Sequence, residues 1–112
     1  MTICDGDDVA VVPFPFTDVA RSKPRPALTL STRAANAASG QTVFAMITTA
    51  AASHWPSDVA LSDLASCGLS HPSVVRFKLF TLDNRLIARR IGALSPADRT
   101  VVRRALRAVL GL

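Results

Sequence analysis

Four prolines within a stretch of fourteen residues, at positions 13, 15, 24 and 26, constrain the fold of this chain more than any other feature. Proline has no backbone N–H and its ring fixes φ, so it is excluded from the middle of a β-sheet ladder. The apolar run at residues 9–12 (VAVV) therefore predicts a short buried strand that leaves the sheet at Pro13 and Pro15.

The second proline pair flanks a single basic residue, Arg25. Proline biases the residue before it toward extended geometry, so we expect Arg25 on a stiff backbone where a loop enters the apolar run at residues 27–30. A guanidinium offers paired donors to phosphate oxygens and stays charged at every physiological pH. The stretch thus favours a phosphate-binding role for Arg25, but it leaves a structural salt bridge with Asp8 or Asp18 equally open.

Further β-rich runs predict strands at residues 42–49, 59–61 and 73–82. The connections are expected at segments of small or turn-forming residues, a loop at 34–40 and a turn at 63–68. Residues 86–94 read as a short strand or turn segment in which Gly92 is a break.

The run at residues 73–82 alternates between two sets of side chains, which predicts one buried and one partly exposed face. The buried set is expected to be Val75, Phe77, Leu79 and Thr81, and the partly exposed set Arg76, Lys78, Phe80 and Leu82.

A terminal helix is expected from Ser95, which suits the N-cap, with Pro96 at the first helical position and Asp98 in a capping-box position. Apolar residues at positions 102, 106, 109 and 110 then mark one face, and arginines at 99, 103 and 107 mark another. Short strands followed by one helix predict a mainly β (α+β) fold, in which the helix packs on a strongly bent antiparallel sheet or partly closed barrel.

Length and composition indicate one soluble domain over residues 1–112. No apolar run approaches the ~20 residues of a membrane span. The first eight residues are acidic where a signal peptide would be basic, so we expect a cytoplasmic protein with no membrane partner. Cys4 and Cys67 lie far apart without CxxC spacing or clustered histidines, which indicates reduced structural cysteines and no metal site.

The net charge of +5 is unevenly distributed along the chain. Residues 64–112 carry nine basic side chains against two acidic ones, whereas residues 1–63 carry four against six. Eleven of the thirteen basic residues are arginine, a type suited to phosphate contact. A solvated basic face is nevertheless the simpler explanation for the arginines of the helix.

The usual catalytic constellations are missing. The two histidines lie beside loop signals, and the sequence holds no Ser/His/Asp spacing, metal-ligand cluster or phosphate-cradling glycine loop, so no cofactor is expected. Attack of an RNA 2′-hydroxyl on its adjacent phosphate needs only proton transfer and charge stabilisation. The groups that could supply these are Arg25, Thr17, Thr48, Thr49, Asp8, Asp18 and Arg76.

Several of these groups have an equally simple structural explanation. Thr48 and Thr49 suit a strand through β-propensity alone. His54 suits either proton transfer or surface packing, and its neighbour Trp55 suits either base stacking or packing over the sheet edge. The residues by themselves therefore permit RNA cleavage without being diagnostic of it.

Ordered motifs along nearly the whole chain resemble the PemK/MazF family of toxin endoribonucleases from bacterial toxin–antitoxin modules. The pieces that carry the resemblance are Asp8, PFPFTD at 13–18, RPALTLS at 25–31, AMIT at 45–48, WPSDV at 55–59, VVR at 74–76, FTLD at 80–83 and IGALSPADR at 91–99.

The resemblance implies a small SH3-like barrel of the CcdB/PemK/MazF type, a homodimer, no cofactor, and sequence-selective, metal-independent cleavage of single-stranded mRNA to a 2′,3′-cyclic phosphate. It also implies growth inhibition, a small acidic antitoxin as partner, and contact with operator DNA only through that antitoxin. Two alternatives stay open, a non-catalytic binding module or gyrase-type toxin of the same fold, and a degenerate inactive toxin.

For the site, the resemblance implies a catalytic pair of Arg25, in proton transfer and charge stabilisation, and Thr48, hydrogen-bonded to the phosphate region. Substrate contacts are expected at Thr17, Asp18, Lys23, Thr49, His54 and Arg76.

Two positions depart from the family pattern. Asp7 stands where glycine is usual. The carboxylate that some members carry shortly after VVR, where it acts as a base, is absent, because Arg76 is followed by phenylalanine and lysine. The proton acceptor therefore stays open between Asp18 and His54.

Overall fold

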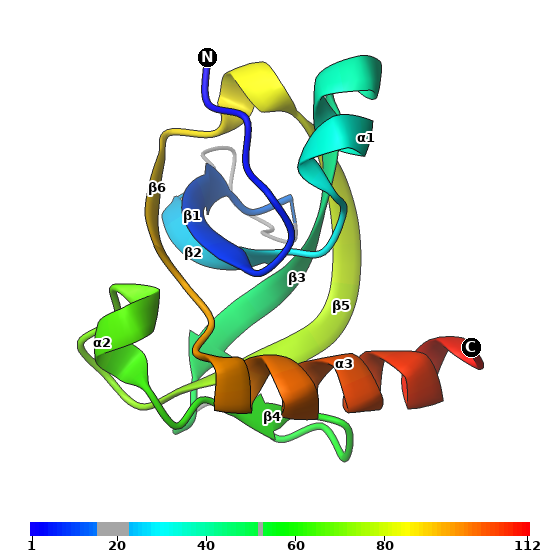
Figure 1. The fold of residues 1–112 in the computed structure, drawn as a ribbon. Coiled ribbons are helices and arrows are strands. Elements are labelled where there is room, and N and C mark those ends of the chain that lie inside the picture. The colour runs from blue at the N-terminus through cyan, green and yellow to red at the C-terminus, as the bar shows by residue number, and fades with distance from the viewer. Residues whose placement is uncertain (16–22, 52) are drawn as a thin grey trace.

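The computed structural model describes residues 1–15, 23–51 and 53–112, and these residues form one six-stranded sheet. The strands, in their order across the sheet, are β4 (Val59–Ala60), β5 (Ser73–Asp83), β3 (Gln41–Thr49), β2 (Pro24–Thr29), β1 (Asp8–Pro13) and β6 (Arg89–Ala93). All neighbouring strands pair antiparallel. Figure 1 shows long, bent β3 and β5 in a sheet curled into a half-barrel, so the predicted bent antiparallel sheet is confirmed.

The C-terminal helix α3 (Pro96–Leu110) begins where the sequence predicts it. Ser95 Oγ accepts a hydrogen bond from the Asp98 N–H at 3.2 Å. The Asp98 carboxylate accepts hydrogen bonds from the backbone N–H groups of Ser62 and Asp63, and so ties the start of α3 to the chain after β4. Burial raises the pKa of the Asp98 carboxyl, but these hydrogen bonds outweigh burial and bring the pKa below its ordinary value of 3.8.

The predicted apolar face of α3 packs on the hydrophobic core through Val102 and Leu106 but not through its last turn. Val102 is buried, whereas Val109 and Leu110 are 43% and 47% exposed. Figure 1 shows the reason, since α3 crosses one end of the half-barrel and its last turns project past the sheet. Among the described residues, no helix has the length and apolar character that crossing a membrane requires.

Asp7 joins the N-terminal segment to α3. Its backbone has φ of 75°, a left-handed conformation that L side chains disfavour and that explains why glycine is usual here. Its Oδ2 lies 2.9 Å from both Arg99 Nε and Arg103 Nη2. The contact with Arg99 is between charges only, because Nε has no directed hydrogen-bond partner in the described chain. The two ion pairs with α3 thus offset the cost of the left-handed backbone conformation at Asp7.

The predicted loop at residues 34–40 is wrong, because α1 (Arg33–Ser39) occupies this segment. Thr32 Oγ1 caps the helix by accepting from the Ala35 N–H at 3.2 Å, and Gly40 ends it with φ of 73°. The buried Asn36 then donates to the Cys4 carbonyl oxygen at 2.9 Å. Alanine favours helix strongly, so small residues between two caps form a short helix that tertiary contacts hold in place.

The predicted turn at 63–68 contains a one-turn helix, α2 (Leu64–Cys67), and Gly92 lies inside β6 rather than breaking it. The short helix and the glycine in β6 are related, because α2 packs closely against β6 at this point. A Cβ on Gly92 would lie 2.5 Å from the Cys67 carbonyl carbon, and one on Gly68 would lie 2.9 Å from the Ile91 carbonyl carbon. Glycine at both positions lets the α2 backbone pack directly on β6.

Side chains on the two faces of the sheet belong to two hydrophobic clusters. The first, which α2 and α3 also join, includes Val9, Leu28, Ile47, Val75, Cys67 and Val102. The second includes Val12, Phe14, Ala27, Phe44 and Phe80. Within it the Phe80 ring centroid lies 5.6 Å from those of both Phe14 and Phe44. The sheet is therefore covered on both faces at its centre.

β5 has the predicted alternation but not the predicted exposure. Val75 and Phe77 are buried in the first cluster, as expected. Arg76 and Phe80, which were expected on a partly exposed face, are also buried, and Thr81 is exposed instead of buried. The second cluster accounts for Phe80, because a strand between two clusters has no solvent face at its centre.

A bulge in β5 bends the sheet. The pairing with β3 passes from Ala45↔Leu79 to Met46↔Arg76, so residues 77 and 78 are additional on the β5 side. A bulge increases local twist and bends the strand, and an even number of added residues keeps the side chains on their original faces. The alternation in the sequence therefore could not reveal it.

We expect Gly92→Ala to destabilise the protein, because its Cβ would overlap the backbone of α2. Overpacking of this kind costs about 1–3 kcal/mol. Unfolding in urea, followed by circular dichroism, should show a lower midpoint. Gly6→Ala is the matched control, since a Cβ there would lie 3.8 Å from its nearest neighbours. Equal midpoints for the two variants would contradict the assigned packing.

Candidate functional site

A small cavity of about 110 Å³ lies where β2 begins, β3 ends and β5 begins. Its lining residues are Arg25, Pro26, Ile47, Thr48, Thr49 and Ser73. It therefore brings together three residues singled out in the sequence, Arg25, Thr48 and Thr49, with one that sequence reasoning missed, Ser73.

The cavity is located where the β2–β3 ladder stops. The pairing runs through Thr29↔Phe44 and Leu28↔Ala45 and ends at Ala27↔Met46. In an antiparallel ladder, hydrogen-bonded and non-hydrogen-bonded pairs alternate. The 2.8 Å bond from the Leu30 N–H to the Val43 carbonyl makes Leu30 and Val43 a hydrogen-bonded pair, so Leu28 and Ala45 form the following one. The next hydrogen-bonded pair would place Pro26 opposite Ile47, and Pro26 has no N–H to donate. The predicted stiff loop-to-strand junction is thus also the point where β2 separates from β3.

The strand register places Arg25 and Thr48 together on one face. Extended past its last pair, Ala27↔Met46, the register would bring Arg25 opposite Thr48, and both residues line the cavity. Both follow the face of the second cluster, to which Ala27 belongs and against which Met46 packs. The Arg25 guanidinium carbon lies 5.9 Å from the centroid of the Phe14 ring. Thr49, which residue type alone did not distinguish from Thr48, is on the opposite face.

Arg25 is exposed and forms no ion pair in the described part of the chain. The salt bridge with Asp8 considered above is not formed, because Asp8 Oδ1 lies 2.9 Å from Arg90 Nε. The other candidate partner, Asp18, and the expected substrate contact Thr17 both lie outside the described residues. Among the described residues, nothing pairs with the Arg25 guanidinium, which therefore leaves its donors to an anion that enters the cavity.

Arg76 has a very different environment from Arg25. Its side chain is 6% exposed and forms an ion pair with the Asp58 carboxylate, whose side chain is 4% exposed, at 2.9 Å. Arg76 Nη1 donates to Ser53 Oγ at 3.1 Å, and Nη2 donates to the Ser53 carbonyl. The Arg76 guanidinium carbon also lies 5.1 Å from the centroid of the Trp55 ring. Arg76 thus holds the segment 53–58, and its predicted substrate contact stays a prediction.

The remaining predicted contacts are at the surface. Lys23 is exposed just before β2, and His54 is exposed in the segment that Arg76 holds. Neither lines the cavity at Arg25. Ser73 could have been found only by knowing that the start of β5 pairs with the end of β3, where Thr49 lies opposite it.

Chemically, the cavity offers donors and charge but no metal ligands. Among the described residues, no three His, Cys, Asp or Glu side chains gather where they could hold a metal ion. Both cysteines are free and buried, and burial raises the pKa of the Cys67 thiol to about 11. A guanidinium next to a threonine hydroxyl is suited to binding a phosphodiester.

The model of PemK-like, MazF-like toxins of type II toxin–antitoxin systems matches residues 7–110. The chain belongs to this family. The match covers all the strands and helices of the described residues, and it confirms the resemblance stated from the motifs.

Solved structures of similar proteins share the fold over nearly the whole chain. A chain of a MazE–MazF crystal structure from Deinococcus radiodurans is 27% identical with a TM-score of 0.78, and each chain covers 99% of the other. The Mycobacterium tuberculosis toxin MazF-mt6 is 23% identical with a TM-score of 0.75, covering 94% of this chain and 97% of its own.

A mycobacterial endoribonuclease, solved in complex with its cognate antitoxin, is 22% identical with a TM-score of 0.75, and the match covers 97% of this chain and 96% of that one. A comparison with curated protein sequences found no significant match.

The buried ion pair yields a stability prediction. Asp58→Asn leaves the Arg76 charge buried without its partner, which should lower the free energy of unfolding by about 3 kcal/mol. Asp83→Asn is the matched control, because the Arg85 side chain of that pair is 77% exposed and the loss should be far smaller. Trp55, the only tryptophan, should report the loosened segment through its fluorescence.

The same pair predicts a pH dependence. The hydrogen bonds from Arg76 hold the pKa of the Asp58 carboxyl below its ordinary value of 3.8. Its contribution to stability is therefore complete above pH 3.8 and is lost as the pH falls through the lower folded-state pKa. Asp58→Asn should remove this part of the acid destabilisation. An unchanged acid limb of the stability profile would contradict the assignment.

Proposed function

We propose that this protein is a toxin endoribonuclease that cleaves single-stranded mRNA without a metal ion and so inhibits growth. The observation that carries the proposal is an exposed Arg25, with no ion pair in the described part of the chain, that lines one cavity together with Thr48. Family membership supports it independently, as do the endoribonucleases among proteins of the same fold.

In the proposed reaction the 2′-oxygen bonds to phosphorus while the P–O5′ bond breaks. The 2′-hydroxyl proton passes to an acceptor, a proton is supplied to the departing 5′-oxygen, and the products are a 2′,3′-cyclic phosphate and a 5′-hydroxyl. Arg25 stabilises the charge that develops on the non-bridging oxygens and takes part in proton transfer, and Thr48 donates a hydrogen bond to the phosphate. The acceptor is Asp18 or His54.

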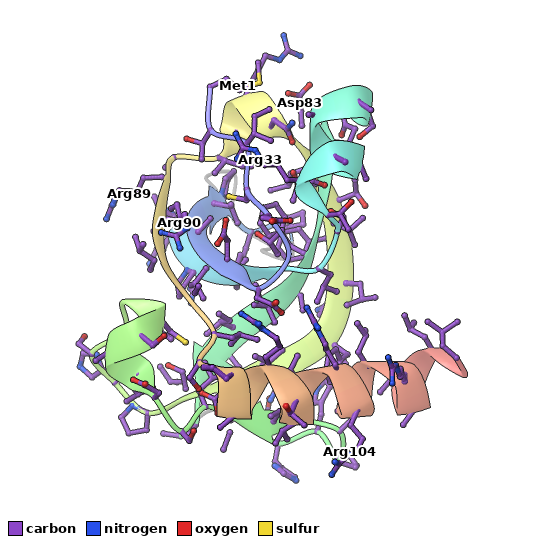
Figure 2. All side chains as sticks on the ribbon, in the orientation of Figure 1. Met1, Arg33, Asp83, Arg89, Arg90 and Arg104 are labelled. Carbon is purple, nitrogen blue, oxygen red and sulfur yellow. The ribbon has the colours of Figure 1, made fainter. Side chains whose placement is uncertain are left out.

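We further propose that the toxin acts in the cytoplasm as a homodimer that a small acidic antitoxin holds inactive. The net charge of +5 and the arginine-rich second half of the chain favour an acidic partner. Figure 2 shows Arg89 extending outward from β6 and Arg104 extending from α3, whereas Arg90 lies on the β1 side of β6, where it pairs with Asp8. Similar toxins have been solved with an antitoxin. Contact with operator DNA would occur only through the antitoxin.

The test is cleavage of a defined single-stranded RNA in the presence of EDTA. Arg25→Ala should remove about 3–4 kcal/mol of transition-state stabilisation. This loss corresponds to a fall in kcat/KM of roughly a hundredfold or more. Arg25→Lys should stay impaired, because a lysine ammonium lacks the planar fork. Product ends should carry a 2′,3′-cyclic phosphate.

Arg85→Ala is the matched control, since it removes the same charge from an exposed ion pair outside the cavity. Intact RNA at every concentration of the wild-type protein would overturn the nuclease proposal. Growth inhibition without cleavage would then favour a gyrase-type or other non-catalytic toxin, and the absence of both would favour an inactive one.

A further inference from the structure

A second hollow adjoins the cavity at Arg25 and is not used by the cleavage chemistry. It has a volume of about 290 Å³ and shares Pro26, Thr49 and Ser73 with the first cavity. The rest of its lining is Gly68, Leu69, Ser70, His71 and Ile91. If one phosphate of an RNA strand binds at Arg25, the nucleotide next to that phosphate can enter this second hollow.

The turn that carries His71 has a fixed backbone. The Ser73 hydroxyl donates to the His71 carbonyl at 2.8 Å, and the Ala50 N–H donates to the Pro72 carbonyl at 2.9 Å. Pro72 itself restricts His71 to extended geometry. On the other side, Gly68 packs on the backbone of Ile91. The hollow is therefore preformed, and binding in it would require little ordering of the turn.

The lining combines apolar walls with one titratable ring. Leu69, Ile91 and Pro26 offer surfaces on which the face of a base can pack. The His71 ring is exposed, and its Nδ1 lies 3.0 Å from Ser70 Oγ. When Ser70 donates to Nδ1, the neutral ring carries its proton on Nε2. Nε2 has no hydrogen-bond partner in the described part of the chain, so it can donate to a ligand.

We propose that this second hollow binds the base of a nucleotide next to the cleaved phosphate, and that His71 recognises the edge of that base. Single-stranded RNA is read in this way, by packing against the face of an unstacked base and by hydrogen bonds to its edge. The inference rests on the proposed nuclease function and deepens it, because it assigns sequence selectivity to a residue outside the Arg25 cavity.

The experiment uses RNA oligonucleotides that differ only in the bases flanking the bond that the wild-type protein cuts. His71→Ala should lower kcat/KM for the preferred sequence roughly tenfold to a hundredfold, the range of one base-edge contact, and should flatten the preference at one flanking position. His71→Gln should restore part of the preference, since its amide places a donor near the position of Nε2. Thr81→Ala, an exposed residue outside both hollows, should leave the profile unchanged.

Binding provides a second measurement that does not depend on cleavage. Fully 2′-O-methylated versions of the same oligonucleotides lack the attacking hydroxyl, and fluorescence anisotropy gives their affinities. A base preference in binding that His71→Ala removes supports the hollow even where no RNA is cut. A His71→Ala protein with the wild-type base profile in cleavage and in binding overturns it, as does a wild-type protein that binds none of these RNAs.

Discussion

The missing N–H of Pro26 is the constraint on which the candidate site depends. β2 pairs with β1 from Pro24 to Leu28, but its pairing with β3 ends at Ala27, the residue after Pro26. A residue with an N–H at this position would extend the ladder toward Thr48 and bring the two strands together. Pro24 and Pro26 together stiffen the backbone around Arg25. Pro26 also keeps an opening between β2 and β3.

Two sets of contacts fix segments that lie outside the cavity at Arg25. Asp58 and Ser53 engage the Arg76 guanidinium and fix the segment that carries His54 and Trp55. α2 packs on β6 through two glycines, and the turn that follows α2 lines the second hollow. Arg25 and Arg76 show how environment separates two identical side chains, because Arg76 is buried in an ion pair whereas Arg25 is exposed and has no ion pair in the described part of the chain.

Much of the fold could be predicted from the sequence, because short-range chemistry specifies it. The prolines, the β-rich runs and the Ser95 cap each act within a few residues of themselves, and the strands and α3 lie where they predict. The errors fall where partners are distant in the chain. α1 depends on contacts of Asn36 with Cys4, the burial of Arg76 depends on Asp58, and the role of Gly92 depends on Cys67.

The sequence by itself determined the family, the bent antiparallel sheet, the terminal helix and the stiff mounting of Arg25, since motif order and local backbone preferences are enough for these. Only the tertiary structure decided which threonine shares a face with Arg25, and only it placed Ser73 in the same cavity and His71 in the adjoining hollow. Strand register makes that choice, because a shift of one residue moves every side chain to the other face. Register depends on pairing between β2, β3 and β5, which no local stretch of sequence encodes.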